Sequence, residues 1–333
     1  MATIHQVAER AGVSSTTVSH VINNTRFVSV DTRNRVLEAM VALGYQPNAL
    51  ARSLRRGETL TIGLILPDSA NPFFAEIGRA VEDAAFHKRY NVILCNTEGD
   101  LEKEQRYVEV LSKKQVDGII FVGTGDQTNS LLSLHTQQIP VVLVDRELPD
   151  LEVDAVLTDN LQGGYLATRH LIDLGHKRIG CITGPSHLTP SAQRVQGYRT
   201  ALKEGGLSVD ESLIERGDFH PESGHSAALT LLSQPNPPSA LFICNDLMAI
   251  GALHAAAEHG FNVPHDLAIV GFDDIELASY AVPSLTTIAQ PKTDIGLHAV
   301  QLLINRISEK SRPVHRELLP VTLIQRKSCG GVQ

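Results

Sequence analysis

The 333-residue chain contains no tryptophan, few cysteines, and no apolar stretch long enough to cross a membrane. Its four cysteines lack the spacing of a metal site, and they are Cys95, Cys181, Cys244 and Cys329. Three of them lie in apolar runs, so we expect buried free thiols. The N-terminus has no secretory signal pattern, so we expect a cytoplasmic protein without a membrane partner.

Common enzyme motifs are missing too, including the phosphate loop GxxxxGK[ST] and the nucleophile motif GxSxG. The adjacent Asp273 and Asp274 could suggest acid–base catalysis. The segment HAAAEH carries His254 and His259, but five residues is poor spacing for one helical face. We therefore expect no enzymatic activity, no cofactor and no metal site.

The N-terminus reads as two short helices, in the segment ATIHQVAERAGVSSTTVSHVINN. Thr3 can cap the first helix, Gly12 separates the two, and Ser14 can cap the second. Apolar residues recur at helical spacing in both: Ile4, Val7, Ala8 and Ala11, then Val18, Val21 and Ile22. Short polar side chains on the second helix are typical of a helix-turn-helix that reads DNA bases. An ordinary helical hairpin is the alternative.

A third helix is predicted to follow, capped by Asp31 or Thr32 and ended by Gly44. Its predicted apolar face comprises Val36, Leu37, Met40, Val41 and Leu43. Three helices in about 45 residues would form a small core, as is common for DNA-binding modules.

The next segment, QPNALARSLRRGETL, is basic and too short for a stable isolated helix. Pro47 marks its start and Gly57 its end. It carries three arginines and an exposed apolar residue, Leu54, so we expect it to fold only on DNA, in the minor groove. A basic linker is the alternative.

Charge is divided unevenly along the chain. Residues 1–60 contain seven arginines and four acidic residues, a net charge of +3, whereas the whole chain carries −8. A positive head on an acidic body suits a DNA-binding module joined to a domain that avoids DNA.

The rest of the chain alternates short apolar runs with helical stretches, which predicts parallel sheets covered on both faces. The expected strands are TIGLILP, NVILCN, DGIIFVG, PVVLVD, AVLTD, RIGCITG, SALFICND and LAIVGF. The pattern restarts near residue 176, which indicates two similar lobes. Ligands of such folds bind at the carboxyl ends of the strands.

Polar and aromatic residues gather at those ends. They are Asn71, Phe73, Phe74, Asp145, Arg146, Asn160, Arg194, Phe219, Asn245, Asp246, Asp273, Asp274 and Gln290. Carboxylates and amides can hydrogen-bond to neighbouring hydroxyl groups of a ligand, and arginine can donate two parallel hydrogen bonds. Aromatic rings can pack against the C–H faces of the same ligand. The set predicts a site for a small polyhydroxylated ligand.

The segments quoted above, with GHKRIGCITGP, NDLMAIGAL, VGFDDIELASY and LTTIAQP, resemble the lactose-repressor (LacI/GalR) family of bacterial transcription regulators. The resemblance covers nearly the whole chain. It implies an all-α helix-turn-helix head on an α/β body with two lobes, like a type I periplasmic sugar-binding protein. Its function would be sequence-specific repression of transcription, controlled by a small effector.

By the same resemblance, ten residues match the sugar contacts of ribose-binding proteins of that fold: Asn71, Phe73, Phe74, Asp145, Arg146, Arg194, Phe219, Asn245, Asp273 and Gln290. We therefore expect D-ribose, or a close furanose or pyranose relative, as effector. A purine or nucleoside is the competing effector. Leu188 and Pro190 stand where purine-responsive members carry an arginine and a threonine, which disfavours a purine.

The resemblance also implies contacts with a palindromic operator, with Leu54 wedged into its central step. The residues expected at DNA are Thr3, Ser14, Ser15, Thr16, Thr17, His20, Asn23, Arg26, Ala51, Leu54 and Arg55. The chain ends in LIQRKSCGGVQ, without the leucine-rich helix of the family's tetramers, so we expect a homodimer. It would associate with the nucleoid when bound to operator.

The predicted organisation is a DNA-binding domain at 1–46, a hinge helix or linker at 47–58, and a regulatory and dimerisation domain at 59–333. Its first lobe would comprise about 59–160 and 291–322, and its second about 161–290 and 323–333. A sugar-transport receptor would share this body, but it would need a signal peptide and no helical head.

Overall fold

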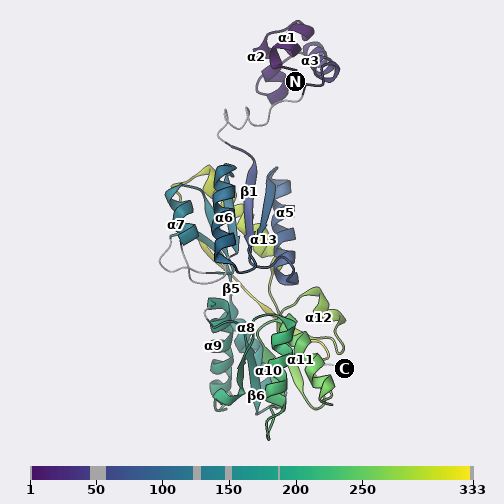
Figure 1. The fold of residues 1–333 in the computed structure, drawn as a ribbon, viewed down its shortest axis with the longest axis vertical. Helices are drawn as coiled ribbons and strands as arrows, with labels where there is room; N and C mark the ends of the chain where they lie inside the picture. The colour runs from purple at the N-terminus through teal and green to yellow at the C-terminus, as the bar shows by residue number, and fades with distance from the viewer. Residues whose placement is uncertain (1, 46–57, 123–128, 147–151, 187, 331–333) are drawn as a thin grey trace. The chain divides into compact units, whose positions relative to one another are not determined.

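The computed structural model describes residues 2–45, 58–122, 129–146, 152–186 and 188–330. The chain folds as two compact units, residues 1–59 and 60–333 (Figure 1). Apart from Glu58, the predicted hinge at 47–58 lies outside the described residues.

The described part of the N-terminal unit, residues 2–45, contains three helices: α1 (Ile4–Ala11), α2 (Ser15–Asn23) and α3 (Val30–Ala42). Thr3 caps α1 in a capping box with Gln6, and Ser14 caps α2 by accepting from the Thr17 amide, so both predicted caps are confirmed. Gly12 ends α1 in the left-handed conformation, with φ of 65°. The core of the unit consists of Val7, Ala8, Ala11, Val18, Val21, Val36 and Ala39.

Two predictions for α3 are wrong. Ser29 caps the helix, rather than Asp31 or Thr32, because its extended backbone lets its hydroxyl accept from the Thr32 amide. The apolar face is also narrower than predicted. Leu37 and Val41 are 46% and 84% exposed, because each lies one position round the helix from the buried stripe.

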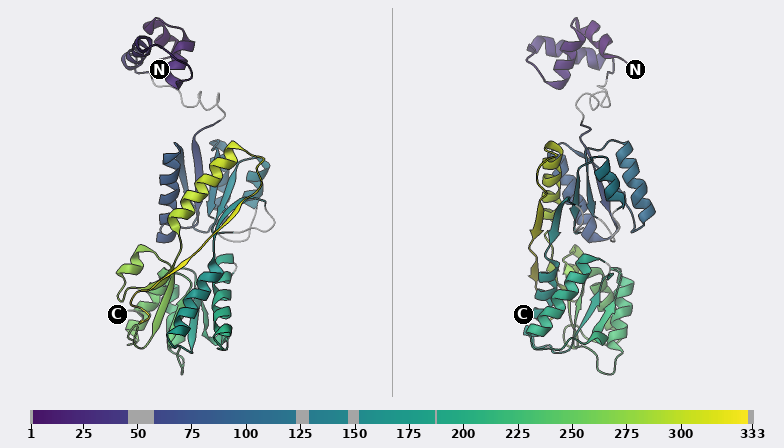
Figure 2. Two further views of the ribbon diagram at one scale, coloured as in Figure 1. Left: turned by 180° about the vertical axis from the view of Figure 1, so that it is seen from behind. Right: turned by 90° about the vertical axis from the view of Figure 1, so that its left-hand side faces the viewer.

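In the second unit, the first sheet has the order β11-β5-β4-β3-β1-β2, and all its strands are parallel. Helices α5 and α13 cover one face and α6 and α7 the other, as the opposite views in Figures 1 and 2 show. We call this sheet with its helices the first lobe. Its elements are β1 (Thr61–Leu66), α5 (Pro72–His87), β2 (Asn91–Asn96), α6 (Leu101–Lys113), β3 (Gly118–Val122), α7 (Asn129–Thr136), β4 (Val141–Val144), β5 (Asp154–Thr158), α13 (Lys292–Ser308) and β11 (Arg316–Leu319).

The second sheet has the order β12-β10-β9-β8-β6-β7, parallel except where β12 pairs with β10. Helices α8 and α9 pack together on one face, and α10 and α11 on the other (Figure 1). We call this sheet with its helices the second lobe. Its elements are α8 (Asn160–Asp173), β6 (Ile179–Thr183), α9 (Thr189–Glu204), a 3-10 turn (Glu211–Leu213), β7 (Ile214–Arg216), α10 (Pro221–Leu232), β8 (Ala240–Ile243), α11 (Asp246–Glu258), β9 (Ala268–Asp273), α12 (Glu276–Tyr280), β10 (Thr286–Ala289) and β12 (Thr322–Ile324).

This architecture confirms the predicted fold class, a helical head with a two-lobed α/β body of mainly parallel sheets. The chain passes between the lobes after β5, after β10 and after β11. All four cysteines are free and buried, as predicted, and burial raises the pKa of Cys95 to about 11. None of the helices in the described ranges is long and apolar enough to cross a membrane.

Candidate functional site

On the face of α2 predicted to read DNA, several side chains form hydrogen bonds with neighbouring residues. The Ser15 hydroxyl lies 3.0 Å from Nδ1 of His5, and Nδ1 of His20 lies 2.8 Å from the Thr25 hydroxyl. Asn23 donates to the carbonyl of Ser19 at 2.9 Å. These contacts fix the side chains before any ligand arrives, which lowers the entropic cost of binding.

The predicted DNA residues differ in exposure. Thr3, Ser14, Thr16 and Arg26 are exposed, whereas Ser15, Thr17, His20 and Asn23 are half-buried. Thr3 and Ser14 lie at helix N-termini, where backbone N–H groups favour phosphate oxygens. Three further residues of the prediction lie outside the described residues: Ala51, Leu54 and Arg55.

A chain of hydrogen bonds joins the carboxyl ends of the two sheets. The Thr158 hydroxyl, at the end of β5, donates to Oε1 of Gln290 at 2.7 Å and lies 3.4 Å from Oδ1 of Asp145. Gln290 in turn donates to Oδ1 of Asp273, at the end of β9, at 2.8 Å. Predicted ligand residues from both lobes therefore share one polar network.

Arg194 is the cation of this network. It is 3% exposed, donates to Oδ1 of Asn160 at 2.7 Å, and lies 3.5 Å from Oδ1 of Asp273. Its guanidinium also stacks 3.8 Å above the ring of Phe272 and donates to the carbonyl of Cys244 at 2.6 Å. The stacking and these hydrogen bonds together fix the plane of the guanidinium group, so that its remaining N–H groups can donate to a ligand in defined directions. We call Asp145, Thr158, Asn160, Arg194, Asp273 and Gln290 the interlobe network.

Burial dominates the titration of its two carboxyl groups. Burial raises the pKa of Asp273 to about 6, although Arg194 and the hydrogen bond from Gln290 oppose the shift. Burial also raises the pKa of Asp145, against the opposing charge of Arg194. A buried carboxyl near its pKa can either donate or accept a hydrogen bond, which suits a hydroxylated ligand.

The backbone around the site is strained. Asp145, Phe219, Asp273 and Asp274 have φ values of 54°, 73°, 108° and 53°, a region that residues other than glycine rarely adopt. Such strain costs about 1–3 kcal/mol per residue and concentrates at functional sites. Three of these four are among the predicted ligand residues, and the φ of Asp273 is the largest among the described non-glycine residues with positive φ.

The remaining predicted residues form smaller groups. Asn71 caps α5 by accepting from the Phe73 amide at 3.0 Å, and the rings of Phe73 and Phe74 meet edge to face at 5.1 Å. Asn245 caps α11 and donates to the carbonyl of Phe219 at 3.0 Å. Phe73 is 3% exposed and serves the core of the first lobe as well. Arg146 is also buried.

Sequence reasoning missed two participants, Thr158 and Lys292. Thr158 ends β5 at the crossing to α8, where only Asn160 was expected among the polar residues at strand ends. Lys292 donates to the backbone carbonyl of Asp273 at 2.8 Å and lies 3.3 Å from Oε2 of Glu76. Nothing in the sequence pattern indicates this role of Lys292, because Glu76 is far away along the chain.

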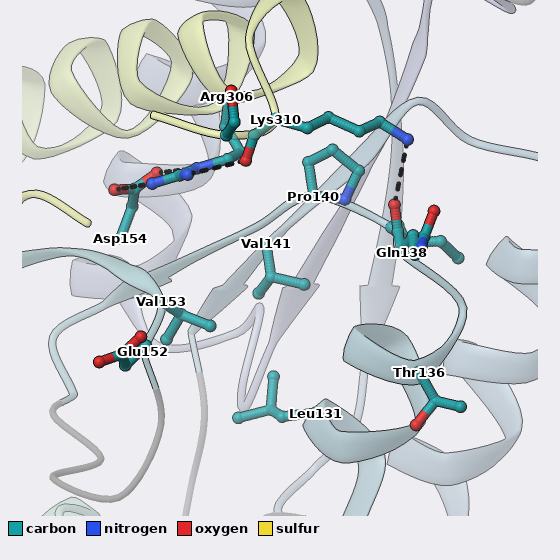
Figure 3. Close-up of a pocket in the computed structure, with 12 residues that line it drawn as sticks. Leu131, Thr136, Gln138, Pro140, Val141, Glu152, Val153, Asp154, Arg306 and Lys310 are labelled. Carbon is teal, nitrogen blue, oxygen red and sulfur yellow. Dashed lines mark hydrogen bonds and ion pairs between the residues drawn. The ribbon is translucent and has the colours of Figure 1, made fainter. Parts of the chain in front are cut away.

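A cavity of about 640 Å³ opens elsewhere, near the amino ends of β4 and β5 and the end of α13 (Figure 3). Arg306 forms a bidentate pair with Asp154, with both N–O distances 2.9 Å, and Lys310 donates to the carbonyl of Gln138 at 3.3 Å. These contacts tie α13 to the sheet. Because ligands of parallel sheets bind at the carboxyl ends, we assign this cavity a structural rather than an effector role.

Two protein families match parts of the chain. Residues 3–48 match the bacterial regulatory proteins of the lacI family. Residues 168–329 match the periplasmic binding protein-like domain.

Full-length relatives are repressors. The chain is 44% identical to the HTH-type transcriptional repressor PurR of Haemophilus influenzae (strain PittEE), over 338 residues that cover 100% of both chains. It is also 44% identical to the ribose operon repressor of Escherichia coli (strain K12), over 330 residues that cover 99% of this chain and 100% of the relative.

Solved structures agree in fold. The lac repressor dimer bound to operator and the anti-inducer ONPF has a TM-score of 0.88 and 30% identity, covering 98% of each chain. A LacI family transcriptional regulator from Enterococcus faecium with bound ribose has a TM-score of 0.74 and 30% identity, covering 82% of this chain and 100% of the other.

Proposed function

Because this chain belongs to the lacI family of bacterial regulatory proteins, we propose that D-ribose, or a close furanose or pyranose relative, controls its affinity for operator DNA. The chain is a DNA-binding transcriptional repressor and not an enzyme, as predicted from its sequence. Repressors of this kind bind operator DNA and a small effector. The proposal concerns which effector this chain binds and how it acts.

The interlobe network carries the proposal. It places two carboxyls, a guanidinium, two amides and a hydroxyl from both lobes within one set of polar contacts. A sugar presents several hydroxyls in different directions, and each can exchange donors and acceptors with such groups. A ligand held by both lobes would favour their closure, because it gains contacts only when both are in place.

The relatives alone do not decide the effector, because the repressor PurR and the ribose operon repressor are both 44% identical to this chain. The start of α9 favours the sugar. Leu188 is its N-cap without a side-chain hydrogen bond, and Pro190 follows in the first turn. Neither side chain can hydrogen-bond to a purine edge. The ribose-bound family member supports the same choice.

We further propose that two copies of the chain bind a pseudo-palindromic operator as a homodimer, with one head on each half-site. The lac repressor dimer on its operator supports this arrangement. Sugar binding would close the lobes and release DNA. Such couplings between sites are typically ~1–3 kcal/mol and reciprocal.

The test is a thermal-shift panel on the full chain with D-ribose, other pentoses, hexoses, ribose 5-phosphate, nucleosides and purines. The absence of tryptophan makes intrinsic fluorescence a poor probe, whereas a bound ligand raises Tm by mass action. We expect a selective rise with D-ribose. A rise only with a purine or nucleoside would contradict the proposed effector and leave the repressor assignment intact.

A further inference from the structure

Two helices of the second lobe, α10 and α11, pack with unusually close backbones. A Cβ added at Gly224 would lie 2.2 Å from the Met248 carbonyl oxygen, and one at Gly251 would lie 2.0 Å from that of Pro221. Only glycine permits this approach. It brings His225, next to Gly224, against the second half of α11.

Three side chains meet there. Nε2 of His225 lies 2.6 Å from Oε2 of Glu258, and Nε2 of His254 lies 3.6 Å from Oε1 of the same carboxylate. The two imidazole rings lie 5.3 Å apart, tilted by 37°. One ligand atom from each of the three lies within 4.8 Å of the other two.

We propose that His225, His254 and Glu258 form a binding site for a divalent transition-metal ion, with Zn²⁺ as the physiological candidate. Two imidazoles and one carboxylate are a ligand set that Zn²⁺ accepts in proteins. This site is separate from the interlobe network and does not depend on the identity of the effector.

The geometry requires little rearrangement. A tetrahedral Zn²⁺ with bonds of about 2.0–2.1 Å separates its ligand atoms by about 3.4 Å. The exposed side chains of His254 and Glu258 can adjust to that spacing, because 69% and 48% of their surfaces are accessible. His225 is less exposed, at 26%, and so provides the fixed ligand.

In the HAAAEH segment, His259 lies at the C-cap of α11, outside the cluster. Glu258 lies one turn after His254 and shares its helical face. The third ligand comes from another helix, 29 residues earlier along the chain. Metal coordination by Nε2 of His225 would replace its hydrogen bond to Glu258 and would crosslink α10 to α11.

The experiment uses the full chain without an affinity tag, freed of metal by a chelator. Zn²⁺ is titrated by calorimetry, and Co²⁺ is added in parallel because its visible absorption reports imidazole coordination. The variants His225→Ala and His254→Ala remove one ligand each. His259→Ala is the matched control, because His259 is exposed, lies at the C-cap of the same helix, and is outside the cluster.

We expect one Zn²⁺ per chain, a visible Co²⁺ band, and a Zn²⁺-dependent rise in Tm. Both ligand variants should lose all three responses, and His259→Ala should keep them. Absence of saturable Zn²⁺ binding would overturn the proposal. So would binding that survives His225→Ala and His254→Ala, or that His259→Ala abolishes equally, since other histidines would then hold the ion.

Discussion

Asp273 combines more constraints than any other residue of the interlobe network. Its backbone has a φ of 108°, the residue is 4% exposed, and its carboxylate accepts a hydrogen bond from Gln290 beside Arg194. Lys292 donates to its carbonyl, so both its backbone and its side chain are held. A residue kept in this state at a cost in stability is best explained by a role in binding.

The raised pKa of Asp273 predicts a pH-dependent stability. The native state keeps the proton up to about pH 6, whereas the unfolded chain releases it near 3.8, so the free energy of unfolding falls as pH rises between these values. The Asp273→Asn variant has no carboxyl group at this position, so it does not lose this stability. The difference in free energy of unfolding, variant minus unsubstituted protein, should therefore increase by roughly 2–3 kcal/mol from pH 4 to pH 7.

Urea unfolding of both proteins across this pH range measures the difference. A difference that stays constant with pH would show that the Asp273 carboxyl titrates normally. Asp273→Asn should also weaken ribose binding at pH 7, because asparagine cannot replace the charge that faces Arg194.

At the scale of elements, the continuous apolar strands could be predicted from the sequence, but β7, β10, β11 and β12 were not among the expected strands. β7, β11 and β12 are edge strands, mostly exposed or half-buried, so they lack the apolar run that marks a central strand. β10 is buried, but it has only four residues, and two of them are threonines. The types of site residue could likewise be predicted from their place at strand ends. Their partners could not, because Thr158 and Gln290 are 132 residues apart and meet only through the crossing of the lobes.

Close packing of α8 on α9 positions Arg194, the cation of the interlobe network. A Cβ at Gly164 would lie 2.0 Å from the backbone oxygen of Arg194. Gly164→Ala must push α9 away, so we expect a loss of stability of about 1–3 kcal/mol and weaker ribose binding. Thermal unfolding and calorimetry measure both effects.

Gly205→Ala is the control, at the C-cap of α9. Gly205 has an ordinary φ of −76°, and the nearest neighbour of an added Cβ would be the flexible end of the Ile172 side chain, at 3.0 Å. This variant should bind ribose normally. If Gly164→Ala also binds ribose normally, the packing of α8 on α9 does not position Arg194 for the ligand.

At the scale of the whole molecule, the chain is a repressor whose DNA-binding head and α/β body are two compact units. The fold divides at residue 59, which lets each part be disabled alone. Leu54→Ala should impair operator binding and leave ribose binding intact.

Arg146→Ala should abolish the response to ribose and leave operator binding intact. If the substitution unfolds the protein instead, Arg146 is structural.

The most direct measurement is the affinity of the protein for D-ribose, with and without saturating operator DNA. The operator is first identified by selecting, from a pool of random DNA sequences, those that the protein binds. Because coupling is reciprocal, operator should weaken ribose binding by the same factor by which ribose weakens operator binding, about 5- to 150-fold. Arg146→Ala should show no ribose binding in either state. Equal ribose affinity with and without operator would contradict the proposal that ribose controls repression.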